Sequence, residues 1–229
     1  QIINAENSNP SANPTTNFAV YATSSDATWN QRYVDASGNP SVSAVWLTDA
    51  QIDNLTITGL NELTLYDFEV VARNQDLVVT ASSTLAGTTT IDLTAPAVDP
   101  VFATAPNPTA VDTINMISTT VTDPSAPVEY FFTAGTGSCG ANAGTGGTNS
   151  AWQTSTTYND AGLQANQCYG YQVTARDSAG NTGTPSTASS TYTLANVPGV
   201  MTFTAISTSS VQIINAENSN PSANPTTNF

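Results

Sequence analysis

Residues 59–74 read GLNELTLYDFEVVARN, and residues 162–177 read GLQANQCYGYQVTARD. The two segments share the pattern G-L-x5-Y-x-[FY]-x-V-x-A-R without a gap. In the first segment Tyr66, Phe68, Val70 and Ala72 alternate with neighbours that are mostly charged. This period of two predicts a β-strand with one buried face and one mostly wet face. The same strand is therefore expected twice in the chain.

A longer repeat surrounds this internal one. Residues 1–18, QIINAENSNPSANPTTNF, recur without change at 212–229, which gives a period of 211 residues. Self-similarity of this kind indicates an array, and a duplicated cloning segment is the alternative. Trp46 and Trp152, each after small residues, precede the two strand segments. One period therefore contains two related domains, which we place at 1–91 and 95–194, and the segment 197–229 begins the next repeat.

The spacing of Leu60 to Tyr66, and of Leu163 to Tyr169, resembles the tyrosine corner of fibronectin type III domains. The turn 177–181 (DSAGN) and the interdomain phrase 92–96 (DLTAP) support the resemblance. It implies an all-β chain of tandem immunoglobulin-like (fibronectin type III-like) β-sandwiches, in which these four residues are structural. The Trp usual in strand B of that family is missing.

The resemblance also implies a strand register. In the second domain strand A is expected near 100–105, B near 113–122, C near 128–134, E near 154–159, F near 167–176 and G near 184–193. Residues 200–207 and 210–217 are then strands A and B of a further domain of the first type. Residues 1–6 are the same strand B, so the first domain lacks its own strand A. Two hypotheses explain the lacking strand A. In the one that we favour, the chain is a segment of a continuous polymer. In the other, each copy donates strands to a neighbouring copy.

The composition excludes several classes of function. The chain has no His, three Lys plus Arg against 17 Asp plus Glu, and a net charge of −14. The three cations are all Arg, whereas binding to nucleic acid needs clustered Lys and Arg. No apolar run is long enough to span a bilayer, so we expect no membrane insertion in this segment.

The two cysteines, Cys139 and Cys168, have no His with which to form a usual zinc site. A disulfide is the preferred interpretation, with free thiols as the alternative, and it places the protein outside a reducing cytosol. The fibronectin-like topology puts the end of strand C beside the start of strand F, where these two residues fall. Without His or Lys, Ser or Cys nucleophiles lack a base. We therefore expect no catalytic residue and no enzyme.

Calcium is the one cofactor that the sequence leaves possible, because turns and linkers carry carboxylate and amide oxygens. The candidate ligands are Asp92, Asp99, Asp123, Asp177 and Asn181. Capping of turns by the same side chains is the preferred alternative. Asn54, in the sequence Asn-Leu-Thr, is a possible N-glycosylation site.

The expected function is a structural segment of a tandem-repeat extracellular filament or giant cell-surface protein, whose partners are copies of itself placed head to tail. The alternative is an adhesin or carbohydrate-binding module, with Trp29, Tyr33 or Trp46 as an exposed aromatic platform. Packing in the core is the competing interpretation of these aromatic residues, favoured for Trp46 and Trp152 by their repeated position.

Overall fold

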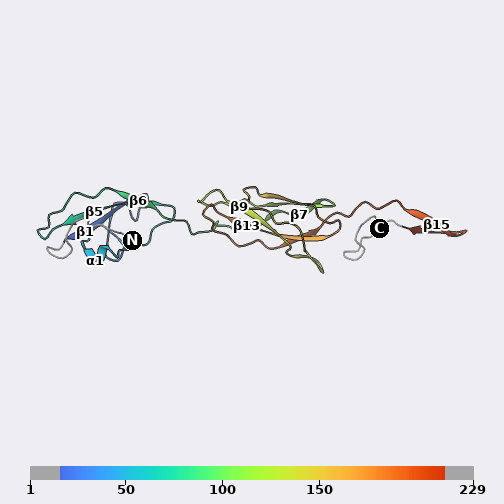
Figure 1. Ribbon diagram of the computed structural model, residues 1–229, viewed down its shortest axis with the longest axis horizontal. Coiled ribbons are helices and arrows are strands. Elements are labelled where there is room, and N and C mark those ends of the chain that lie inside the picture. Colours follow the sequence, from blue (N-terminus) through green and yellow to red (C-terminus); the bar gives the residue numbers. More distant parts are fainter. Residues whose placement is uncertain (1–15, 215–229) are drawn as a thin grey trace. The chain divides into compact units, whose positions relative to one another are not determined.

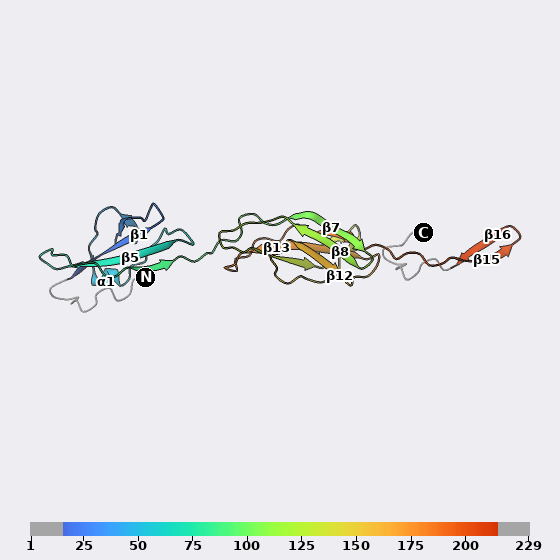
Figure 2. The same ribbon diagram turned by 90° about the horizontal axis from the view of Figure 1, so that it is seen from above.

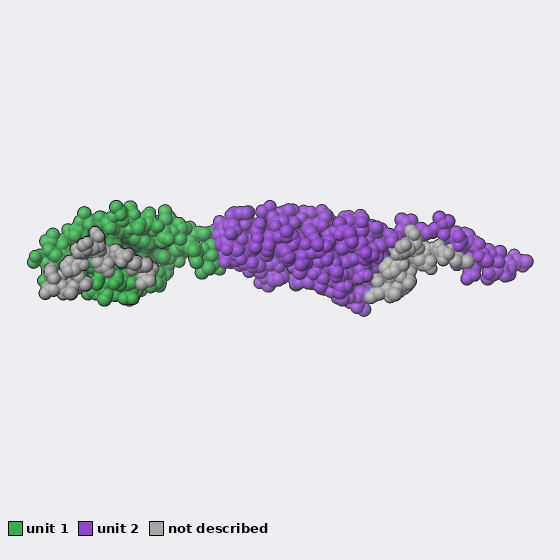
Figure 3. Space-filling view, viewed as in Figure 1, with its two compact units in different colours: residues 1–93 green, residues 94–229 purple. Residues whose placement is uncertain are grey.

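A computed structural model describes residues 16–214, and the regular secondary structure of this part of the chain is almost entirely antiparallel strands (Figure 1). The expected all-β class is therefore confirmed. The chain divides into two compact units, Gln1–Leu93 and Thr94–Phe229, which Figure 3 colours separately. Most of the 18-residue repeat, and the strand expected at 1–6, lie outside the described residues.

The first unit is organised by two long strands, β1 (Asn17–Ser24) and β5 (Leu65–Arg73). They pair antiparallel along their whole length, from Asn17 opposite Arg73 to Ser24 opposite Tyr66. The sheet runs β3-β2-β1-β5-β6, and β4 also pairs with β1. The remaining elements are β2 (Arg32–Val34), β3 (Pro40–Ser41), β4 (Leu47–Thr48), α1 (Asp49–Ile52) and β6 (Ala86–Thr89).

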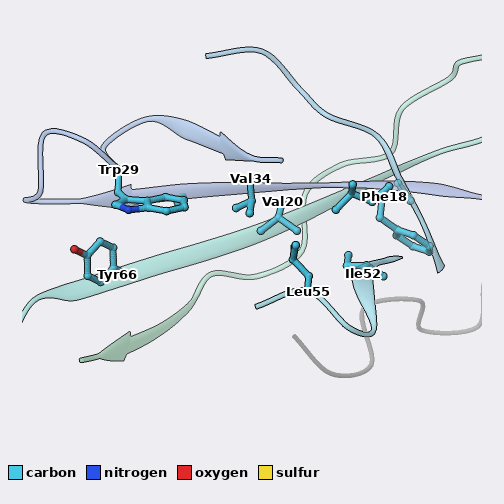
Figure 4. Packing of buried hydrophobic residues seen from close by; sticks show 10 residues of the cluster. Phe18, Val20, Trp29, Val34, Ile52, Leu55 and Tyr66 are labelled. Atoms are coloured by element: carbon cyan, nitrogen blue, oxygen red, sulfur yellow. The ribbon is translucent and has the colours of Figure 1, made fainter. Parts of the chain in front are cut away.

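The core of the first unit lies on one face of this sheet. Phe18 and Val20 from β1, Tyr66 from β5 and Ile52 of α1 belong to one buried cluster, and Figure 4 shows Ile52 close to Phe18, at the end of the cluster away from Tyr66. All four side chains are buried. The alternation expected for residues 66–72 is present in the structure, because every second side chain of the strand points towards this core.

The second unit is a sandwich of two three-stranded sheets. One sheet has the order β12-β8-β7 and the other β14-β13-β9, and every pairing is antiparallel. Figure 2 looks onto β7, β8 and β12, with β13 beneath them. The strands are β7 (Phe102–Ala110), β8 (Thr113–Ser118), β9 (Glu129–Ala134), β12 (Thr157–Ala161), β13 (Cys168–Arg176) and β14 (Ser189–Tyr192).

The two units bury equivalent positions to different extents. In the second unit Tyr171 and Val173 of β13 are 0% exposed, because Ile114 and Met116 of β8 belong to the same core cluster. The corresponding residues of β5, Phe68 and Val70, are only partly buried. Among the described residues of the first unit, no second sheet is formed that matches β12-β8-β7.

A separate hairpin follows the second sandwich. Its strands are β15 (Thr202–Ser207) and β16 (Ser210–Ile214), and Figure 2 shows them side by side. These are the residues that the sequence assigned to strands A and B of a further first-type domain, apart from 215–217, which are not described.

The expected register differs from the structure at three places. Strand A continues to Ala110 with irregular pairing. Strand B ends at Ser118 instead of residue 122, because the chain turns there and the Val121 N–H donates to the Tyr130 hydroxyl at 2.8 Å. Strand G is shorter than expected and spans only Ser189–Tyr192. The Gly-rich loop at 135–148 contains two short paired strands, β10 (Ser138–Cys139) and β11 (Asn142–Ala143).

Candidate functional site

The disulfide joins the Gly-rich loop to the first residue of β13. Cys139 and Cys168 are bonded across 29 positions of sequence, with their Cα atoms 6.1 Å apart. The Tyr192 hydroxyl also holds this loop. It donates to the Cys139 carbonyl at 3.1 Å and accepts a hydrogen bond from the Asn142 side-chain amide at 2.6 Å. The expected disulfide is confirmed, and it fits an oxidising compartment.

A tyrosine in each unit ties its own strand to the preceding turn. The Asn61 N–H donates to the Tyr66 hydroxyl at 2.9 Å, and the Gln164 N–H donates to the Tyr169 hydroxyl at 2.8 Å. Leu163 is buried and Leu60 packs against the first core. A buried phenol whose hydroxyl returns to backbone five residues upstream is the arrangement called a tyrosine corner.

The first corner has an additional acceptor. The Tyr66 hydroxyl donates to the Asp26 carboxylate at 2.8 Å, and the Thr28 N–H donates to the same carboxylate at 2.9 Å. Chiefly the Thr28 N–H, and then the Tyr66 hydroxyl, hold the pKa of Asp26 below its usual 3.8. Burial, above all, raises the pKa of Tyr66.

An arginine lies over a tryptophan at the same place in both units. The guanidinium carbon of Arg73 is 4.3 Å from the ring centre of Trp46, and that of Arg176 is 4.3 Å from the ring centre of Trp152. Both tryptophans are half-buried. These residues were identified from the sequence as a repeated Trp and a repeated Arg, but their pairing was not foreseen. The signal was present, because two of only three cations recur at the end of the same strand.

The second Arg–Trp pair has more partners than the first. The Arg176 side chain forms an ion pair with Glu129 at 2.8 Å, and the Phe131 ring lies 5.2 Å from that of Trp152. Glu129 stands opposite Arg176 in the β9–β13 ladder, and such cross-strand pairs stabilise a sheet. The face of this sheet that points away from the core is thus organised around Trp152.

The expected aromatic platform does not form. Trp29 is 0% exposed, and its indole N–H donates to the Gly59 carbonyl at 3.1 Å, so the expectation that it is exposed is wrong. It fills the core beside Tyr66, where Figure 4 shows the two rings close together. Trp46 is half-buried and covered by Arg73. Tyr33 is half-buried too, and packs edge-on against Tyr21 at 5.0 Å.

A buried carboxylate connects the two sheets of the second unit. Asp160, on β12, is 2% exposed. It accepts the Tyr171 hydroxyl of β13 at 2.8 Å and the Thr148 N–H at 2.8 Å. The Tyr158 hydroxyl donates to the Thr148 carbonyl at 2.7 Å. Burial first, and then the charge of Asp160, raise the pKa of Tyr158 to about 12, and the pKa of Tyr171 is raised as well. No sequence pattern singled out this network.

Three of the candidate calcium ligands, Asp123, Asp177 and Asn181, take part in turns of the second unit. Both carboxylate oxygens of Asp177 accept hydrogen bonds from Asn181, at 2.9 and 2.8 Å. Asp123 accepts the Ser125 N–H at 2.8 Å, and Asp99 accepts the Thr184 N–H at 2.7 Å. Asp92 is buried at the end of the first unit. Calcium binding stays a prediction, which titration with Ca²⁺ in a calorimeter measures.

The remaining predicted site is the sequon. Asn54 is exposed, and its amide donates to the Ala50 carbonyl at 3.0 Å, just after α1. Glycosylation of Asn54 stays a prediction. Among residues 16–214, no helix has the length and apolar character needed to cross a membrane.

Comparison with known proteins gives one related sequence and many related structures, two of which are described below. No family model matches the chain. The chain is similar to exoglucanase B of Cellulomonas fimi, with 34% identity over 145 residues, but this is 63% of the chain and only 13% of that protein.

The two structures are fibronectin type III domains. One contains the FN1–FN3 domains of chicken CNTN1, with 17% identity, a TM-score of 0.40, and coverage of 78% of this chain and 56% of that one. The other is the fibronectin type III domain of human fibronectin type III domain containing protein 3, with 17% identity, a TM-score of 0.31, and coverage of 44% and 88%.

The fold itself follows from strand order and local contacts. In the second unit β12-β8-β7 faces β14-β13-β9, which is strands E, B and A against G, F and C of a fibronectin type III sandwich. The first unit repeats the C–F–G part of this order with β1, β5 and β6. Each unit has a tyrosine bonded to backbone at the start of strand F. The described chain is thus built from two fibronectin type III-like units, of which the second shows both sheets of the β-sandwich.

Proposed function

We propose that this chain is a structural segment of a tandem-repeat extracellular protein, either a filament or a giant cell-surface protein. The observation that carries the proposal is the recurrence of residues 1–18 at 212–229, one period of 211 residues apart. Repeats of this kind stack or string together units of one design. Within the period, two units with the same corner and the same Arg–Trp pair follow each other.

The second unit has features that suit a domain under mechanical tension. The disulfide ties the loop after β9 to β13, and the Asp160 carboxylate bonds to Tyr171 of the opposite sheet. Both connections resist separation of strands that are far apart in sequence. The disulfide also supports an extracellular or cell-surface location, because thiols stay reduced in most cytosols.

The same proposal holds that this segment is not an enzyme. Fibronectin type III-like folds are usually non-catalytic, and the sequence contains neither His nor Lys to activate a Ser nucleophile. Both cysteines are consumed by the disulfide. The partners we propose are further copies of the same repeat. We propose no binding to nucleic acid, because a net charge of −14 repels its phosphates.

A second candidate is a non-catalytic accessory or carbohydrate-binding segment. The likeness to a protein named exoglucanase B supports it. The aromatic surface available is the half-buried pair of Tyr21 and Tyr33. A pull-down on insoluble cellulose tests it. Retention that Tyr33→Ala abolishes would favour this candidate over the structural one.

Electron microscopy of the native material tests the structural proposal. The expected result is fibres, or long surface projections, in which two sandwich units recur for every 211 residues. Dispersed globular particles from native material would contradict it. Sequencing the parent gene is the second test, because a gene that encodes residues 1–18 only once would remove the repeat itself.

A further inference from the structure

The β15–β16 hairpin has one face that is lined by apolar side chains. In its ladder Phe203 stands opposite Ile213, and Ala205 stands opposite Val211. Directly opposed residues share a face, and so do residues two apart on one strand, so these four side chains lie on the same side. Thr204, opposite Gln212, lies on the other side.

The apolar face has no cover among the described residues. Phe203 is 59% exposed, Val211 61% and Ile213 58%. A lone two-stranded hairpin is marginally stable in water, and it needs a third strand or a packing partner. A contiguous exposed apolar face of this kind marks an interaction surface.

The first unit has a sheet face that matches this requirement. Its strands β1, β5 and β6 correspond to β9, β13 and β14 of the second unit. In the second unit β7 and β8 pack on that face and leave Tyr171 and Val173 fully buried. Their counterparts Phe68 and Val70 pack against the first unit's own core but stay only partly buried. The hairpin β15–β16 has the antiparallel arrangement of β7–β8, the layer that residues 16–93 of the first unit do not form.

The sequence specifies which unit the hairpin belongs to. Residues 212–214, at the end of β16, are identical to residues 1–3, and the identity continues to residue 229. Residues 17–18, which begin β1 of the first unit, recur as residues 228–229. In the order of the repeat, the hairpin therefore stands after a second-type unit and before a first-type unit.

We propose that the β15–β16 hairpin of one copy docks through Phe203, Val211 and Ile213 onto the β1–β5 sheet of the first unit in a second copy. The hairpin takes the place that β7 and β8 occupy on the second unit, and its strand β16 replaces the strand expected at residues 1–6, whose sequence it repeats from residue 212 onward. This inference deepens the proposed function, on whose repeat it rests, by naming the contact between successive copies. The two contacting surfaces are different, so the contact is head-to-tail. Such a contact can repeat from copy to copy and build an open filament.

Sedimentation velocity on the 229-residue chain, with its disulfide intact, tests the proposal. The weight-average mass is expected to rise from that of one 23.6 kDa chain at low micromolar concentration to at least twice that value near millimolar concentration. Phe203→Asp, on the apolar face, is expected to hold the mass at one chain. Thr204→Asp is the matched control, because it adds the same charge to the opposite face of the same strand, and it is expected to associate like the unchanged chain.

A mixing experiment identifies the acceptor. A Phe203→Asp chain keeps its first unit, so it is expected to cap the oligomers of the unchanged chain and to lower their average mass when added in excess. If the hairpins pair with each other instead, the variant leaves that mass unchanged, and the proposal is overturned. A chain that stays single at every concentration, or equal loss of association in both variants, overturns it as well. A single-chain result together with native fibres would reject this contact and leave the structural function standing.

Discussion

Arg176 lies over the ring of Trp152 with its guanidinium carbon 4.3 Å from the ring centre, and its side chain reaches Glu129 at 2.8 Å. One cation therefore serves an aromatic face and a carboxylate on a neighbouring strand. The equivalent Arg73 lies over Trp46 at the same distance. Two of the three cations in the chain are used in this way.

Arg176→Ala is expected to lower the free energy of unfolding of the second unit by about 1–3 kcal/mol. The stacking contributes on the order of 0.5–2 kcal/mol, and the partly exposed ion pair roughly 0.2–1 kcal/mol. Urea unfolding followed by tryptophan fluorescence measures the effect. Arg32→Ala is the control, because Arg32 bonds only to nearby carbonyls of exposed residues, and an equal loss there would contradict the assignment.

Replacing both cysteines, Cys139→Ala with Cys168→Ala, is expected to destabilise the second unit by about 3–4 kcal/mol on the chain-entropy model for a loop of this length. The bridge spans 29 positions. Calorimetry of the double variant and of the unchanged chain resolves the separate transitions of the two units. The transition of the first unit is expected to stay in place, and a matching shift in both would mean that the bridge does not act locally.

Tyr66→Phe is expected to change how the first unit responds to acid. The pKa of Asp26 is lowered, so its ionised form stabilises the folded unit above the usual value of 3.8, and this stability is lost as the pH falls through the lower folded pKa. Without the Tyr66 hydroxyl the lowering is smaller, and the loss in acid is smaller too. Unfolding midpoints from pH 6 to pH 2 measure this.

Tyr169→Phe is the matched control, since its hydroxyl accepts the Gln164 N–H. It is expected to cost about 1 kcal/mol at neutral pH, the usual net value of one hydrogen bond. A similar acid response in both variants would exclude Asp26 as the cause.

The second unit is expected to lose stability in alkali. The pKa of Tyr158 is raised to about 12, so the folded unit holds the phenol proton more tightly than the unfolded chain, in which the value is 10.0. The stability is present in full below pH 10 and declines as the pH rises towards 12. Tyrosinate absorbance and circular dichroism, recorded together, follow it, and Tyr158→Phe is expected to make the decline shallower. Ionisation of Tyr158 near pH 10 in the folded chain would contradict the assignment.

Much of the fold could be predicted because apolar and polar residues alternate along short stretches of the sequence. The alternation at 66–72, and the same spacing at 169–175, locate strands β5 and β13 directly. The disulfide followed once the topology placed the end of strand C beside the start of strand F. These predictions needed only neighbours along one strand or one known pairing.

The parts that sequence reasoning missed depend on contacts across sheets. Asp160 meets Tyr171 from the opposite layer, and no spacing in sequence encodes that distance. Trp29 was a candidate for an exposed aromatic platform with core packing as the alternative, and its ring turns into the core beside Tyr66. The pairing of Arg176 with Trp152 depends on a bridge from Gln153, the next residue, to Tyr130 of β9, which itself pairs with β13. Periodicity alone does not give this arrangement.

The Arg–Trp pairs have a consequence for resistance to proteases. Trypsin-like enzymes cut after Lys or Arg, and the chain offers three such bonds in 229 residues. Two of them end long strands, with the side chain held flat against an indole ring. A protease that must draw the scissile segment into an extended form in its own cleft has to strip that side chain from its ring and peel the strand from its sheet. Material with this design would persist where digestive enzymes are abundant.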